Sequence, residues 1–107
     1  MSFDIPARPA PALDPAPAGG SGYGAEEALL QGIAVELTAL GERVMIRRTG
    51  EGRPFLCAIG VLPRFNEEIN VVRRGGEVRA VWSWSEELPV HPGEAAAAIR
   101  RVINPTA

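Results

Sequence analysis

The sequence predicts an α+β fold with two layers, in the order α-β-β-β-β-α, in which a four-stranded antiparallel sheet carries two helices on one face. Three observations support this expectation. Residues 25–40 place apolar side chains at helical spacing, residues 69–84 alternate around two adjacent glycines, and residues 93–103 show a second helical pattern. Each of these elements has one apolar face, so we expect the helices and the sheet to bury those faces against each other.

The first helix is expected over residues 25–40. Its spacing brings four apolar side chains to one face: Leu30, Ile33, Leu37 and Leu40. Glu26 and Glu27 fall in the first turn, where acidic groups favour the helix dipole. Gly41 suits the position just after the helix, and Gly32 inside it marks a close approach to another element.

The first two strands are expected at residues 43–48 and 55–61. In residues 43–48, Val44 and Ile46 share one face, and Arg43, Met45 and Arg47 share the other. Residues 55–61 are apolar on both faces, which is typical of a central strand. The intervening residues 49–54 are rich in glycine and favour a turn.

The next two strands form a hairpin around Gly75 and Gly76. This turn sets the register, which pairs Arg74 with Glu77, Val72 with Arg79, Val71 with Ala80, and Ile69 with Trp82. Alternation then assigns Trp82 and Trp84 to the face that meets the core, and Arg74 and Arg79 to the opposite face.

The last helix is expected over residues 93–103. Pro92 fits the first helical position, and Arg100 and Arg101 lie in the last turn, where positive charge complements the helix dipole. Asn104 and Pro105 end it.

The chain is expected to hold one folded domain, residues 25–104, between a disordered tail, residues 1–24, and a short C-terminal end, residues 105–107. The tail is rich in proline and glycine and has neither helical nor strand periodicity. Its Pro6-Ala7-Arg8-Pro9 sequence has the spacing of a polyproline II ligand, but we favour a plain linker in a chain rich in alanine and proline. Roughly 80 folded residues make a marginal core, so self-association as a homodimer is compatible with this size.

The formal net charge of −2 is unevenly distributed. Residues 43–79 hold eight arginines against four acids, whereas residues 1–42 hold one arginine against six acids. All eleven basic residues are arginines, which fits a high-GC genome as well as guanidinium chemistry. A single cysteine, the absence of a signal-like N-terminus and the absence of a long apolar run predict a cytoplasmic protein without membrane association.

Catalytic and cofactor signals are weak. Cys57 and His91 are each the only residue of their type, so they offer no metal-ligand spacing. Cys57 belongs to an apolar strand, and His91 is expected to cap the last helix or to be exposed. The acidic pairs, such as Glu67-Glu68, point to different sides of their elements, and the glycine-rich turns connect strands rather than opening helices. We therefore expect no enzyme, no metal and no cofactor; a small enzyme using Cys57, His91 or Trp84 is the third alternative.

The candidate binding residues are the basic side chains of the helix-free sheet face and one tryptophan: Arg43, Arg47, Arg74, Arg79 and Trp84. The arginines suit an acidic protein surface or nucleic acid phosphates. Nucleic acid is the second choice, because the hairpin register turns the stacking tryptophans away from the arginines. A solvated face in which Arg74 pairs with Glu77 is the functionless alternative. Trp84 is either an interface anchor at the strand end or a residue that closes the core beneath the last helix.

The segment Val81-Trp82-Ser83-Trp84 and the alanine-rich helix from Glu94 to Ile103 resemble small uncharacterised α+β proteins of high-GC actinobacteria. The resemblance covers about residues 25–103 and implies no activity. These proteins are similar in size to accessory proteins that work beside regulators, which favours a binding role by association. The expected function is a small interaction module that binds a protein partner through the arginine-bearing sheet face or a strand edge.

Overall fold

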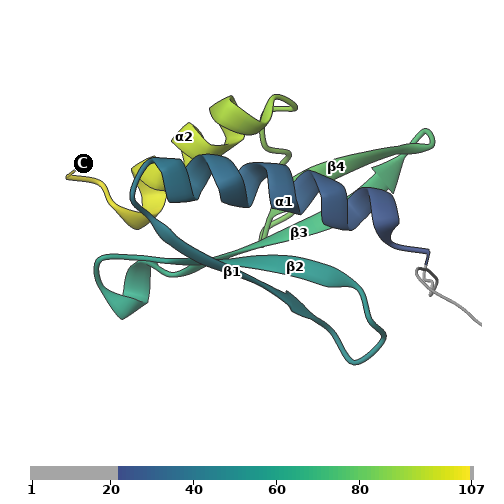
Figure 1. The fold of residues 1–107 in the computed structure, drawn as a ribbon, viewed down its shortest axis with the longest axis horizontal. Helices are drawn as coiled ribbons and strands as arrows, with labels where there is room; N and C mark the ends of the chain where they lie inside the picture. The colour runs from purple at the N-terminus through teal and green to yellow at the C-terminus, as the bar shows by residue number, and fades with distance from the viewer. Residues whose placement is uncertain (1–21, 107) are drawn as a thin grey trace, which may run out of the picture.

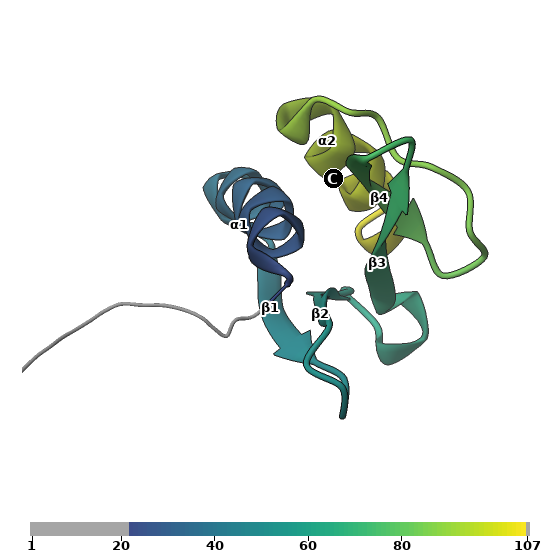
Figure 2. The same cartoon turned by 90° about the vertical axis from the view of Figure 1, so that its right-hand side faces the viewer.

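The computed structural model describes residues 22–106 and confirms the predicted α+β fold. Two helices lie side by side on one face of a four-stranded antiparallel sheet (Figures 1 and 2). The strands follow chain order across the sheet, so each joins its neighbour through a short connection. The elements are α1 (Gly24–Ala39), β1 (Arg43–Arg48), β2 (Pro54–Ile59), η3 (Pro63–Phe65), β3 (Glu67–Arg74), β4 (Glu77–Trp82) and α2 (Pro92–Ile103). Of the predicted tail, residues 1–21 lie outside the described residues, and Gly24 begins α1.

The ends of both helices follow from local chemistry. Gly41 has a φ of 87°, a left-handed conformation that suits glycine. Its N–H donates to the Thr38 carbonyl at 2.9 Å, and the Glu42 N–H donates to the Leu37 carbonyl at 3.0 Å, which closes α1 in a Schellman motif. Pro92 is the first residue of α2, as predicted, and the preceding His91 is exposed and forms no side-chain cap.

The predicted hairpin register is confirmed in all four of its pairs: Arg74–Glu77, Val72–Arg79, Val71–Ala80 and Ile69–Trp82. Gly75 and Gly76 have φ values of 58° and 82°, and a two-residue type I′ turn requires positive φ at both positions. β2 is central in the sheet, as predicted, but it ends at Ile59, two residues before the predicted boundary. Beyond it, the Gly60 N–H donates to Asn66 Oδ1 at 2.8 Å and the Val61 N–H donates to the Ile103 carbonyl at 3.0 Å.

The core lies between the helices and the sheet. Its largest fully buried apolar side chains come from both helices and the two central strands: Leu30, Ile33, Leu37, Leu56, Ile69, Ile99 and Ile103. Gly32 lies against Pro92, which explains the close approach expected from a glycine inside α1. The carboxylate of Glu42, after α1, accepts hydrogen bonds from Arg100 and Asn104, each at 3.1 Å, and so ties α1 to the end of α2. Neither α1 nor α2 covers the outward face of the sheet (Figure 2).

Candidate interaction surface

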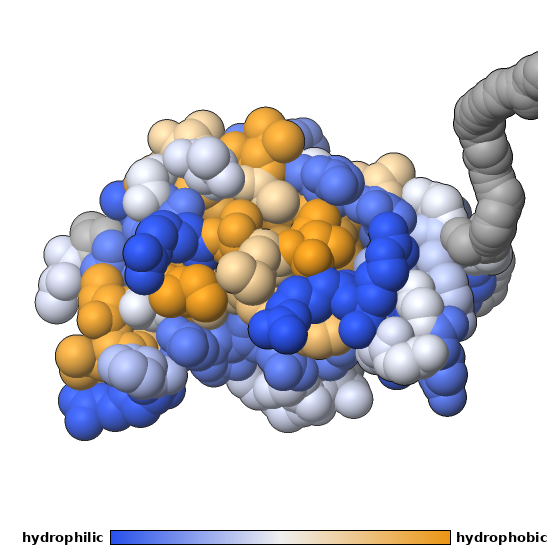
Figure 3. Space-filling model, turned by 60° about the horizontal axis from the view of Figure 1, so that its bottom comes forward, coloured by the Kyte–Doolittle hydropathy of each residue, from blue (hydrophilic) through white to orange (hydrophobic). Residues whose placement is uncertain are grey.

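The face of the sheet away from the helices has an apolar centre. On β1 and β2 it pairs Arg43 with Ile59, Met45 with Cys57, and Arg47 with Phe55. Figure 3 views the molecule from below the sheet of Figure 1 and shows a hydrophobic area near the middle, bordered by hydrophilic residues. Met45 is the most exposed of the apolar residues here, with 51% of its surface accessible. An apolar area of this kind at a sheet surface is a common feature of binding sites.

The predicted basic face divides into two parts that differ in their ion pairing. On the β3–β4 hairpin, Arg74 donates to Glu87 at 2.6 Å, and Arg79 pairs with Glu77. The ion pair between Arg74 and Glu77 that the functionless alternative assumed is therefore wrong. Arg74 pairs with Glu87 instead, and Glu77 pairs with Arg79. On β1, in contrast, Arg43 and Arg47 have no ion-pair partner among residues 22–106.

Trp84 lies outside the core, so the prediction that it faces the helices is wrong. β4 ends at Trp82, and a tight turn follows in which the Ser85 N–H donates to the Trp82 carbonyl at 2.8 Å and Ser85 has a φ of 74°. Strand alternation stops at this turn, and the ring of Trp84 stacks on Trp82 at 4.9 Å between centroids. Trp82 is buried, whereas Trp84 is 54% exposed and donates its indole N–H to Glu86 at 2.9 Å.

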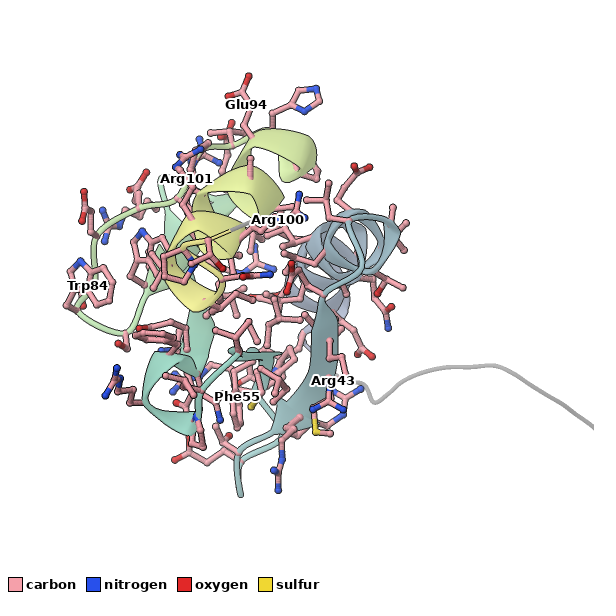
Figure 4. The ribbon with its side chains drawn as sticks, turned by 90° about the vertical axis from the view of Figure 1, so that its left-hand side faces the viewer. Arg43, Phe55, Trp84, Glu94, Arg100 and Arg101 are labelled. Atoms are coloured by element: carbon pink, nitrogen blue, oxygen red, sulfur yellow. The ribbon has the colours of Figure 1, made fainter. Side chains whose placement is uncertain are left out.

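The five predicted binding residues do not form one patch. Figure 4 shows Arg43 and Trp84 on opposite sides of the molecule, Arg43 near β1 and Trp84 beyond the other edge of the sheet. Arg47 shares β1 with Arg43, and the paired arginines belong to the β3–β4 hairpin. The structure therefore separates the four arginines into two sets, Arg43 with Arg47 on β1 and Arg74 with Arg79 on the hairpin.

The two edges of the sheet differ in whether another part of the chain pairs with them. At the β4 edge, the chain turns back after Trp84: the Trp82 N–H donates to the Glu86 carbonyl at 2.8 Å, and the Leu88 N–H donates to the Ala80 carbonyl at 2.9 Å. Residues 86–88 thereby pair with residues 80–82 and cover that end of the β4 edge. At the other edge, no segment of residues 22–106 pairs with the outer side of β1. An open edge has backbone groups ready to bind another strand.

A hollow of about 420 Å³ lies between α1 and the open edge of β1. It is lined by residues of both elements: Gln31, Ala34, Val35, Thr38, Val44, Met45 and Ile46. A second hollow of about 280 Å³ lies on the helix-free face, where its lining includes Met45, Arg47 and Cys57. Met45 lines both, so the two hollows lie on either side of this side chain. We name this region the β1-edge surface and define it by Val35, Arg43, Val44, Met45, Ile46, Arg47 and Cys57.

Sequence reasoning did not identify Val35 and Met45 as binding residues. Val35 falls outside the apolar face of α1 and is 64% exposed, and Met45 lies between two arginines on β1. The sequence did contain one indication of these two residues. Both are large and apolar, and both occupy positions that the periodicity of their element assigns to solvent. Only the packing of α1 against β1 shows that they border one hollow.

Cys57 and His91 lie on different layers, so they form no nucleophile–base pair. Cys57 points to the helix-free face of β2, and His91 precedes α2 on the opposite face. Burial raises the pKa of the Cys57 thiol, the charge of Glu68 raises it further, and Arg47 partly opposes both effects. A raised pKa keeps the thiol protonated near neutral pH, where it is a weak nucleophile. Within the described part of the chain, no three histidine, cysteine or acidic side chains group as metal ligands would.

Comparisons with protein-family models, with curated proteins and with solved structures found no match to the chain. Among residues 22–106, neither helix has the length and apolar character needed to cross a bilayer.

Proposed function

We propose that this protein is a non-enzymatic interaction module of the cytoplasm that binds a protein partner through the β1-edge surface. The observation that carries the proposal is the coincidence of three features on one strand. Within residues 22–106, β1 has an open edge, it borders an apolar hollow, and its Arg43 and Arg47 have no ion-pair partner. Apolar contact gives affinity to a protein interface, and charged groups at its border select the partner.

The hollow favours a protein over nucleic acid. Nucleic acid binding draws most of its affinity from many cationic contacts to phosphates. Two of the four predicted arginines, Arg74 and Arg79, are already engaged by glutamates, which reduces the positive charge available on the sheet. The exposed apolar side chains of Val35 and Met45 suit the side chains of another protein.

The proposal can be tested by affinity capture with the wild-type chain and an Arg43→Glu/Arg47→Glu variant. The matched control is Arg53→Glu/Arg101→Glu, which makes the same change in net charge at two other exposed arginines without ion-pair partners among residues 22–106. Circular dichroism and thermal unfolding establish that all three chains fold equally. We expect one protein to be captured by the wild type and the control and to be lost by the β1 variant.

The captured protein is then purified and its affinity for each chain measured directly. A loss of at least about tenfold for the β1 variant alone supports the proposal. Equal loss in both variants, with affinity that falls steeply as salt rises, indicates a general charge effect typical of nucleic acid and contradicts it. Retention of every partner by the β1 variant also contradicts it.

A further inference from the structure

The two faces of β1 carry different side chains, so a strand that binds beside it needs different side chains on each of its own faces. Val44 and Ile46 point toward α1 and line the hollow there, and both are half-buried. Arg43, Met45 and Arg47 point to the helix-free face, where each of the three is exposed. The free edge lies between these two rows over six residues, a length of about 20 Å in an extended chain.

A strand that adds to this edge places its own side chains on the same two faces in alternation. Its residues opposite Val44 and Ile46 enter the hollow beside Ala34 and Val35, so apolar side chains fit there. Its residues opposite Arg43 and Arg47 meet positive charge on the other face, so acidic side chains fit there. On this second face, the residue between the two acidic positions lies opposite Met45.

The arginines disfavour a second copy of this chain at the same edge. If two copies of β1 pair in antiparallel orientation about Met45, Arg43 of each copy lies directly opposite Arg47 of the other. Directly opposed side chains on one sheet face lie about 4.5–5.5 Å apart at their Cβ atoms, and like charges at that distance repel. The same charges that oppose self-pairing attract a strand of opposite charge.

The geometry points to an extended segment of a partner protein, with the pattern acidic-apolar-any-apolar-acidic, that binds as a fifth strand beside β1. The backbone of the segment pairs with the free edge, its two apolar residues enter the hollow between α1 and β1, and its two acidic residues pair with Arg43 and Arg47. The pattern reads the same in both directions, so it fits a parallel or an antiparallel partner. This inference rests on the proposed function and specifies the chemistry of the partner.

The test uses the full-length chain, labelled with ¹⁵N, and the synthetic peptide Ser-Glu-Val-Thr-Val-Glu-Ser with blocked ends. Its valines and glutamates occupy the positions described above. Titration to millimolar peptide, followed by amide NMR, gives both the affinity and the residues that respond. We expect saturable shifts centred on residues 43–48 and slower hydrogen exchange of the outward amides of β1.

Two controls separate strand addition from general attraction. The peptide Ser-Glu-Glu-Val-Val-Thr-Ser has the same composition, but no register places both valines on one face, so we expect it to bind at least about tenfold more weakly. The Arg43→Glu/Arg47→Glu variant should lose the first peptide to a similar extent and should bind Ser-Arg-Val-Thr-Val-Arg-Ser instead. Recovery of binding by exchanged charges is not expected if the arginines only support the fold.

Several results overturn the inference. These are equal binding of both glutamate peptides, shifts that avoid β1, or no saturable binding at millimolar peptide. A concentration-dependent dimer that protects β1 would assign the edge to a second copy. The chain also carries Phe3-Asp4-Ile5 outside the described residues; if Phe3→Ser/Ile5→Ser alone shifts the β1 amides, the edge belongs to the chain's own segment.

The outcomes distinguish this inference from the proposed function. If the peptide fails but a captured protein still depends on Arg43 and Arg47, the partner binds in another form and the proposed function stands. If the peptide binds at β1 but no protein depends on these arginines, the strand chemistry is supported and the proposed function is wrong.

Discussion

Arg73 holds the buried carboxylate of Glu26 with two hydrogen bonds, from Nε to Oε2 at 2.9 Å and from Nη2 to Oε1 at 3.2 Å. The arginine occupies a helix-facing position near the end of β3, opposite Val78, and Glu26 lies in the first turn of α1. The glutamate side chain is only 6% exposed, whereas that of Arg73 is about half exposed. The pair therefore fixes the start of α1 to the sheet at the border of the core.

We expect Arg73→Met to lower the free energy of unfolding by about 1–3 kcal/mol, because it leaves the buried Glu26 carboxylate without its charged partner. The neighbouring substitution Arg74→Met is the control, since Arg74 and Glu87 form an exposed pair worth about 0–1 kcal/mol. Urea unfolding of both variants measures the difference. Equal effects would show that the Arg73–Glu26 pair contributes no more than an ordinary surface pair.

We expect a side chain at position 60 to destabilise the protein. A Cβ at this position would lie 2.5 Å from Phe65 Cβ and 2.7 Å from the Phe65 carbonyl carbon, so the loop would have to move. We expect Gly60→Ala to cost about 1–3 kcal/mol of stability. Thermal unfolding measures it, and an unchanged melting temperature would contradict it.

Gly32→Ala should stabilise the protein, in contrast to Gly60→Ala. A Cβ here meets Pro92 at 3.7 Å, an ordinary van der Waals distance, and the residue lies inside α1. Alanine favours a helix interior over glycine, so we expect a gain of up to about 1 kcal/mol in stability. A lower melting temperature would mean that α1 and α2 cannot accept the added methyl group.

Trp84 should contribute far less to stability than Trp82. Loss of the exposed stacked ring in Trp84→Ala removes about 0.5–1.5 kcal/mol. Loss of the buried ring in Trp82→Ala removes about 3–5 kcal/mol. Chemical unfolding monitored by circular dichroism compares the two variants, and a similar loss of stability in both would contradict the prediction.

The reactivity of Cys57 should depend on its two charged neighbours in opposite directions. Because Arg47 lowers and Glu68 raises the pKa of the thiol, Arg47→Ala should raise this pKa and slow alkylation at a given pH. Glu68→Gln should lower the pKa and accelerate alkylation. The pH profile of iodoacetamide labelling, followed by mass spectrometry, measures both shifts, and shifts of the same sign would contradict this arrangement of charges.

The fold was largely predictable because its determinants are local. The paired glycines set the hairpin register, and helical spacing with Gly41 and Pro92 set the helix ends within one or two residues. The position of Trp84 was not predictable, since alternation holds only while the strand continues, and the chain turns after Trp82.

The candidate surface was only partly predictable for a different reason. Alternation placed Arg43 and Arg47 on the helix-free face, where the structure has them. The partners that engage Arg74 and the apolar contribution of Val35 depend on contacts between segments distant in the chain. Periodicity describes each element separately and contains no information about which elements meet at an edge.

The pairing of residues 86–88 with β4 has a consequence for assembly. Among residues 22–106, no segment pairs with the outer side of β1, whereas residues 86–88 cover the β4 edge at residues 80–82. A partner strand beside β1 would occupy the open edge and produce a complex of one to one stoichiometry. Partial cover of the β4 edge by the chain itself hinders the edge-to-edge stacking of sheets that builds filaments.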